Sequence, residues 1–411
     1  MTYFPSVSFA DNPGIDAFSR LRVSTPVTLF SVQNQYLASP LVMEPGATGT
    51  GVTPALNANT RMVLLSATAG SGTSFFQSFR YLPYQPGRSQ FIAMTGVMGT
   101  GLAGAVVDAG YFDAANGIFY RQNGASGMQI VRRSSTSGSV VNEVINQADW
   151  NQDTFLGSGL NPSGITLDPT KDFILVMDLQ FLAMGRVRVG FDIDGVIHWA
   201  HYFKHANIIA VPYMQTATLP VGMLLTATST ASTKNDCFFK CVSVMSEGGD
   251  SEDFQYTFAV PECTVTAGNG SAAHLLSFRP KTTFNSLVNR TDIKLNNLAL
   301  TVTGANPVRW DIVIGQAITA PTWLDVNGTY SACEYTNAGT LSGSPGVVAQ
   351  SGYCTSGSSF KENILRDVFT HYPITLDRAG AVRALGTVSV LVTGISGTSA
   401  TRGFFNFEET R

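Results

Sequence analysis

Residues 185–203, GRVRVGFDIDGVIHWAHYF, constrain the fold more than any other stretch of this chain. Two alternating apolar and polar runs flank Asp194 and Gly195, a dipeptide typical of the two-residue turn that joins antiparallel strands. If these residues form the turn, Val196 pairs with Ile193 and the pairing continues in step from there. The sequence therefore predicts a β-hairpin with one register along its whole length.

This register assigns the hairpin side chains to two faces, because successive residues of a strand point to opposite sides of the sheet. The face expected to be core carries Val187, Val189, Phe191 and Ile193 against Val196, His198, Ala200 and Tyr202. The other face sets a polar strand against an aromatic one, and its candidate ligand or interface residues are Arg186, Arg188, Trp199, His201 and Phe203. Trp and Arg are frequent interface hot spots. Packing within the protein, with Trp199 covering Gly190, is the alternative.

The rest of the chain repeats this pattern of short alternating runs that end at Gly, Pro or Asn. Pro86 and Gly87 fit the centre of a type II turn, and Asn116 and Gly117 suit a second turn between strands. Residues 358–369 are the best helix candidate, with apolar residues at helical spacing after a serine. We therefore expect an all-β protein with two β-sandwich or jelly-roll domains, the first similar to lectin-like jelly rolls.

The domain boundary is predicted at residues 245–254, MSEGGDSEDF, where acidic residues and glycines gather. We expect an extended N-terminal arm with loops over residues 1–61, a lectin-like β-sandwich over 62–248 and a second β-sandwich over 254–411. The length of 411 residues suffices for two such cores.

The composition gives no reason to expect nucleic acid or a membrane as a partner. Asp, Glu, Lys and Arg make up 13% of the residues, about half the usual share, and the net charge of −3 gives no reason to expect nucleic acid as a partner. Neither a signal peptide nor a long apolar run is present, so membrane insertion is not expected. The five cysteines form no CxxC pair, and buried free thiols are the favoured interpretation.

The candidate groups for chemistry each have a structural explanation. His198, His201 and His205 have metal-ligand spacing only on a helix; on the predicted strand His198 points to the core and the other two point outward. Asp192 and Asp194 could suit a glycosidase pair, but Asp is common at hairpin turns. We therefore expect no catalytic residues, no metal site and no cofactor.

Several segments together resemble a family of tailed-bacteriophage virion structural proteins that share a "DAF-RLRVS" N-terminal segment: DAFSRLRVSTPVTLF, RYLPYQPGRSQF, GYFDAANGIFYR, WNQDTFLGSG, GRVRVGFDIDG, HWAHYFKHAN and FNFEETR. The resemblance runs from about residue 12 to the C-terminus. It implies a structural component of the virion, made in the host cytoplasm, with no established enzymatic activity. A major capsid protein of the usual tailed-phage fold is not expected, because its long helix would show as helical periodicity.

The leading hypothesis is a non-enzymatic virion protein that forms a symmetric homo-oligomer on the particle surface and contacts other virion proteins, as a head decoration, head fibre or tail-associated protein. A receptor- or glycan-binding module directed at a host surface glycan is the second hypothesis, and a cell-wall-degrading enzyme the third.

In residues 18–25 a basic side alternates with an apolar side until Pro26 stops ladder pairing. Phe18, Arg20, Leu21 and Arg22 are therefore the candidate assembly arm.

Overall fold

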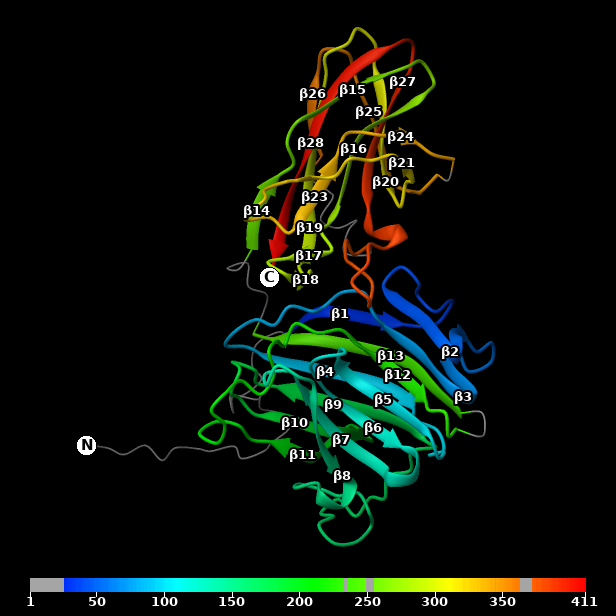
Figure 1. Ribbon diagram of the computed structural model, residues 1–411, viewed down its shortest axis with the longest axis vertical. Coiled ribbons are helices and arrows are strands. Elements are labelled where there is room, and N and C mark those ends of the chain that lie inside the picture. The colour runs from blue at the N-terminus through cyan, green and yellow to red at the C-terminus, as the bar shows by residue number, and fades with distance from the viewer. Residues whose placement is uncertain (1–25, 232–234, 249–254, 344, 363–371) are drawn as a thin grey trace, which may run out of the picture. The chain divides into compact units, whose positions relative to one another are not determined.

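The computed structural model describes residues 26–231, 235–248, 255–343, 345–362 and 372–411 (Figure 1). The chain forms two compact units, residues 1–78 with 82–251 and residues 79–81 with 252–411. Apart from three short 3-10 helices, Gly124–Ser126, Gln147–Asp149 and Ala384–Gly386, the regular elements in the described ranges are strands. The all-β prediction is confirmed. The predicted helix over 358–369 is strand where it is described, because Ser359–Glu362 form β26, and its remainder lies outside the described residues.

One 13-stranded antiparallel sheet builds the first unit. Its main path runs β11-β10-β9-β4-β13-β3-β12-β5-β6-β7-β8, with β1 added to β13 and β2 added to β3. The strands are β1 Val27–Gln33, β2 Met43–Leu56, β3 Val63–Ser78, β4 Ser89–Val97, β5 Ala105–Phe112, β6 Gly117–Asn123, β7 Gly127–Ser134, β8 Val141–Asn146, β9 Asp172–Leu179, β10 Val187–Ile193, β11 Val196–Phe203, β12 Val221–Ala227 and β13 Asn235–Glu247.

This sheet curls so that its inner face packs against itself. The ring of Tyr120 on β6 lies 5.7 Å from that of Phe173 on β9 and 5.2 Å from that of Phe191 on β10, although these strands are distant in the sheet order. Residues from one side of most of these strands enter one shared hydrophobic core, as expected of a sheet with one buried face. The first unit is therefore a β-sandwich of the jelly-roll kind.

The segment predicted as an arm and loops, 1–61, contributes two strands to this sheet. β1 pairs with β13, and β2 pairs with β3 along most of its length. Phe30 and Met43 are buried in the core. The prediction is thus wrong for the described part, because the Gly-rich composition that suggested loops forms a long strand, in which Gly46 leaves room for the ring of Phe75.

The second unit is a sandwich of two antiparallel sheets. One has the order β14-β28-β19-β26 with β15 on β28, and the other has the order β22-β23-β16-β27-β20-β25. Phe278 of β16 and Phe407 of β28 join the two sheets, with ring centroids 4.6 Å apart. The strands are β14 Gln255–Ala259, β15 Cys263–Ala267, β16 Ala272–Pro280, β17 Thr283–Phe284, β18 Leu287–Val288, β19 Asp292–Val302, β20 Val308–Ile314, β21 Ile318–Thr319, β22 Leu324–Asp325, β23 Cys333–Thr336, β24 Thr340–Leu341, β25 Val347–Cys354, β26 Ser359–Glu362, β27 Val388–Gly394 and β28 Ser399–Thr410.

The division between the units, after residue 251, falls inside the acidic stretch 245–254. All five cysteines are free, and four are buried while Cys241 is partly exposed. Burial raises the pKa of the Cys263 thiol to about 11, which keeps it protonated at neutral pH. Within the described ranges, no helix is long and apolar enough to cross a membrane.

Candidate functional site

The β10–β11 hairpin contains the predicted turn but not the predicted register. Asp194 and Gly195 have φ angles of 54° and 83°, and Ile193 pairs with Val196. After Gly190 has paired with Trp199, the register shifts, and Val189 pairs with His201. Ala200 is therefore an extra residue in β11, and such a β-bulge exchanges the faces of every residue beyond it.

The bulge divides the predicted ligand face. Phe203 packs in the core with Val187 and Val189, and His201 lies 4.7 Å from the Phe203 ring. Tyr202, predicted to be core, instead joins Trp199 in a small cluster on the outer side of the sheet. Of the five predicted residues, the structure keeps Arg186, Arg188 and Trp199 together and moves the other two to the opposite face.

The outer cluster is a packed structural element. The Arg188 guanidinium forms an ion pair with Asp178 on β9, both side chains being fully buried, and lies 4.5 Å from the centre of the Trp199 ring. Trp199 covers Gly190, since a Cβ atom on Gly190 would lie 3.0 Å from Trp199 Cε3. Trp199 is only 7% exposed. In this arrangement these side chains stabilise the sheet and offer no open surface to a ligand.

The two histidines expected at the surface are buried. His205 stacks on the Tyr213 ring at 4.1 Å, and its Nδ1 lies 2.6 Å from the Gly185 carbonyl oxygen. His201 Nδ1 accepts a hydrogen bond from the Asn151 N–H at 3.3 Å. Burial lowers the pKa of each to about 4, so both are neutral at pH 7. The Nδ1 atom of His205 carries the proton, because the Gly185 carbonyl oxygen can only accept a hydrogen bond. The described ranges contain no group of three His, Cys, Asp or Glu side chains that could hold a metal.

An open hollow of about 220 Å³ lies on the inner side of the β7–β8 hairpin. Arg132 of β7 and Glu143 of β8 form its charged wall, with Arg132 Nη2 2.6 Å from Glu143 Oε2. The segment after β11 supplies Tyr213 and apolar side chains such as Val211, which is 54% exposed. Among the described residues this is the hollow that best combines open apolar surface, an ion pair and hydroxyl groups, so it is the candidate functional site.

The Tyr213 wall of this hollow is firmly held. The Tyr213 N–H donates to the Ala183 carbonyl at 3.0 Å, and the Gln215 side chain bonds both the hydroxyl and the carbonyl of Ser135. The sequence does not predict this site, because Arg132 and Tyr213 are far apart in the chain. The only local signal is the run VRRSSTSGS at residues 131–139, where basic and hydroxyl side chains are adjacent.

The Asp192 and Asp194 pair lines a second hollow, of about 370 Å³, at the ends of β9 and β10. Asp192 Oδ1 accepts the Gly195 N–H at 2.9 Å, as turn-forming aspartates do. Asp168 on the same rim accepts hydrogen bonds from the Thr170 hydroxyl and N–H, which lower its pKa. These carboxylates shape turns.

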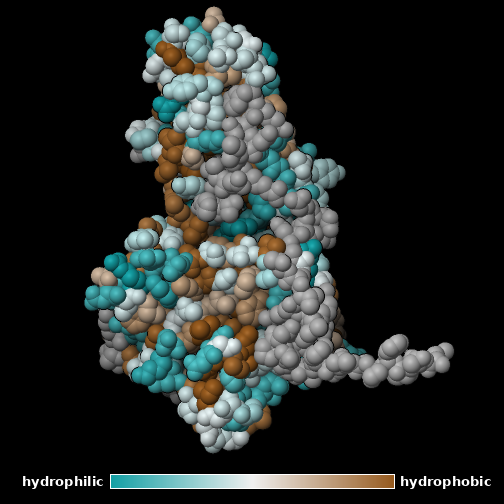
Figure 2. All heavy atoms as spheres, turned by 180° about the vertical axis from the view of Figure 1, so that it is seen from behind, coloured by the Kyte–Doolittle hydropathy of each residue, from teal (hydrophilic) through white to brown (hydrophobic). Residues whose placement is uncertain are grey.

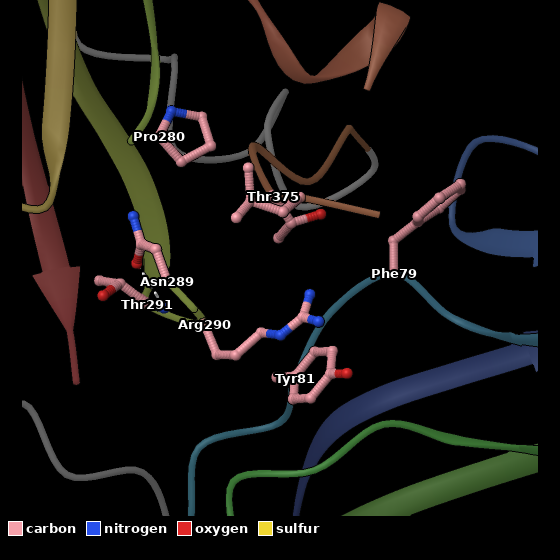
Figure 3. Close-up of a pocket in the computed structure, with 8 residues that line it drawn as sticks. Phe79, Tyr81, Pro280, Asn289, Arg290, Thr291 and Thr375 are labelled. Atoms are coloured by element: carbon pink, nitrogen blue, oxygen red, sulfur yellow. Dashed lines mark hydrogen bonds between the residues drawn. The ribbon is translucent and has the colours of Figure 1, made fainter. Parts of the chain in front are cut away.

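The second unit has a small hollow between Phe79, Tyr81 and the segments near Arg290 and Thr375 (Figure 3). The Arg290 guanidinium lies 4.1 Å from the centre of the Tyr81 ring and donates to the carbonyls of Asp377 and Arg378. The volume of about 10 Å³ admits one water molecule at most. This hollow is therefore a packing feature.

The candidate assembly arm, Phe18, Arg20, Leu21 and Arg22, lies outside the described residues.

No family model matches the chain, and no curated protein matches its sequence. Several solved structures resemble part of it. A glycosyl hydrolase family protein from Mycobacterium fortuitum has 12% identity, covering 53% of this chain and 99% of its own, with a TM-score of 0.36. Peanut lectin has 9% identity, 54% and 98% coverage and a TM-score of 0.33, and a legume lectin-like domain from Entamoeba histolytica has 8%, 54%, 98% and 0.31.

Proposed function

We propose that this chain is a non-enzymatic structural protein of a tailed-bacteriophage particle, where it forms a symmetric oligomer and contacts other virion proteins. The resemblance of its segments to a virion protein family supports the phage assignment. The observation that carries the structural role is that the arginine and histidine side chains considered for ligand or metal binding pack inside the protein. Arg188 forms a buried ion pair with Asp178, and His205 stacks on the Tyr213 ring and hydrogen-bonds to the Gly185 carbonyl oxygen.

The character of the surface supports the same proposal. Large apolar side chains such as Tyr36, Ile208 and Tyr353 are exposed at separate places, and Figure 2 shows brown side chains interspersed among teal ones on one side of the molecule. With 13% charged residues in the sequence, such a surface suits contacts with neighbouring subunits, whose interfaces are depleted of charge at their centres.

An image reconstruction of the intact particle tests the proposal. We expect density for two all-β units at a symmetric position on the head, neck or tail. Absence of this protein from purified particles, as measured by mass spectrometry, would overturn the proposal. Release of reducing sugar from host cell-wall polysaccharide by the purified protein would favour the enzymatic hypothesis instead.

The assembly arm requires a deletion that spares the fold. Removing residues 1–30 would also remove Phe30 from the core, so deletion of residues 1–25 is the cleaner variant. We expect this variant to keep its unfolding midpoint and to enter particles poorly. Normal incorporation would show that the arm has no role in assembly, and Phe30→Ala serves as the control for a loss that arises from the fold.

A further inference from the structure

We propose that the hollow at the β7–β8 hairpin binds a single neutral sugar ring, the terminal unit of a glycan. This proposal goes beyond the structural role in the particle and does not depend on it. The hollow is distinct from the Trp199 cluster, which is closed.

Two hydrogen-bonding groups in the wall of this hollow have no partner among the described residues. The hydroxyl of Tyr213 is buried, and the structure shows no hydrogen-bond partner for it in the described residues. The Nε of Arg132 is likewise buried and without a partner there. Both residues line the same hollow, where the hydroxyl groups of an occupant would supply the partners that buried polar groups ordinarily have.

The charged groups in the wall of the hollow favour a neutral occupant. Arg132 and Glu143 neutralise each other at 2.6 Å, so the hollow does not favour an anion or a cation. A guanidinium donates hydrogen bonds and a carboxylate accepts them. Neighbouring hydroxyl groups on a ring fit this pair, since one accepts from Arg132 while the next donates to Glu143. Sugars present such hydroxyl pairs.

The remaining lining of the hollow has an apolar side and several hydroxyl groups. Val141, Ile209, Val211 and Pro212 form an apolar side that suits the C–H groups of a ring, while Ser134, Thr136 and Ser137 provide additional hydroxyl groups. The volume of about 220 Å³ lies below the roughly 300–1,000 Å³ of pockets for drug-sized ligands. One ring fits inside, and the open side leaves room for the rest of a glycan.

Saturation-transfer NMR of the full-length protein with a panel of neutral monosaccharides and one acidic sugar tests this proposal. We expect at least one neutral sugar to bind, and Tyr213→Phe to weaken it about tenfold, the usual effect of a lost hydrogen bond to a buried group. Tyr353→Phe, at a 74% exposed tyrosine of the second unit, is the matched control and should leave binding unchanged.

Val211→Asp provides a second variant that the fold should tolerate, because Val211 is half exposed. It places a charge against the apolar side and should abolish the signal without shifting the unfolding midpoint. Absence of binding by every neutral sugar would overturn the proposal. So would binding that neither variant changes, or selective binding of the acidic sugar.

Discussion

Arg188 and Arg132 each form an ion pair with a carboxylate, but only the Arg132 pair lines an open hollow. Each lies in the first unit's sheet and forms an ion pair with a carboxylate on a neighbouring strand, Asp178 and Glu143 respectively. The side chains of the Arg188 pair are fully buried, whereas those of Arg132 and Glu143 are 19% and 44% exposed. Exposure and cover, rather than residue type, decide whether such a pair is part of the packing or part of a site.

Asp178→Ala should have the largest effect on stability. It leaves the buried Arg188 without its carboxylate, and breaking a buried pair costs about 3–5 kcal/mol. Glu143→Ala is the matched change at the open pair and should cost less than about 1 kcal/mol, because exposed ion pairs contribute little. Urea unfolding of both variants measures the difference. Equal losses would show that burial does not separate the two pairs.

Acid should weaken the first unit through His201 and His205. Their folded pKa of about 4 lies below the ordinary value of 6.5, so the unfolded state binds protons first. Their contribution is complete above pH 6.5 and is lost as the pH falls from 6.5 towards 4. We expect about 1–3 kcal/mol per histidine. Unfolding midpoints measured across this range should decline less in His205→Gln; an unchanged decline would contradict the assignment.

Gly190→Ala should disturb the buried Arg188–Asp178 pair by displacing the Trp199 ring that packs on Arg188. The added Cβ would lie 2.4 Å from the His198 carbonyl oxygen and 3.0 Å from Trp199 Cε3. Overpacking of this kind costs roughly 1–3 kcal/mol. Gly343→Ala, where a Cβ meets no atom within 4 Å, is the control. Thermal unfolding and tryptophan fluorescence should both respond only to the first substitution.

The turn that sets the hairpin should give the smallest effect. Asp194 has a φ of 54°, a conformation that Asn tolerates and Ala does not. We expect Asp194→Ala to cost about 1 kcal/mol and Asp194→Asn almost nothing. Chemical denaturation distinguishes them, and identical stabilities would show that the turn residue does not hold the register.

The sequence predicts local features of this fold well. The Asp194–Gly195 turn depends on adjacent residues, and the Asn116–Gly117 turn likewise joins the paired strands β5 and β6. The turn at Gly87 also forms, with a φ of 83°. However, its flanking strands β3 and β4 do not pair with each other; both pair with β13. Such pairing depends on strands distant in sequence, which turn chemistry does not specify.

The candidate site shows the same limit more strongly. Trp199 is correctly placed because the register holds as far as Gly190, and Arg188 is correctly placed because the extra residue lies in β11 and leaves the alternation of β10 unbroken. His201 and Phe203 are misplaced because no residue type announces the bulge at Ala200. Arg132 and Tyr213 meet only through the curl of the sheet and the stacking of Tyr213 on His205, and no spacing in the sequence encodes that meeting.

The bulge at Ala200 also has a genetic consequence. Ala200 is the extra residue, so in-frame loss of its codon would leave Gly190–Trp199 and Val189–His201 as consecutive pairs and would keep Tyr202 outside the core and Phe203 inside it. Insertion of one codon elsewhere in β11 would instead bring Phe203 out of the core and Tyr202 into it. This strand should therefore tolerate the loss of its extra residue far better than a further gain in length.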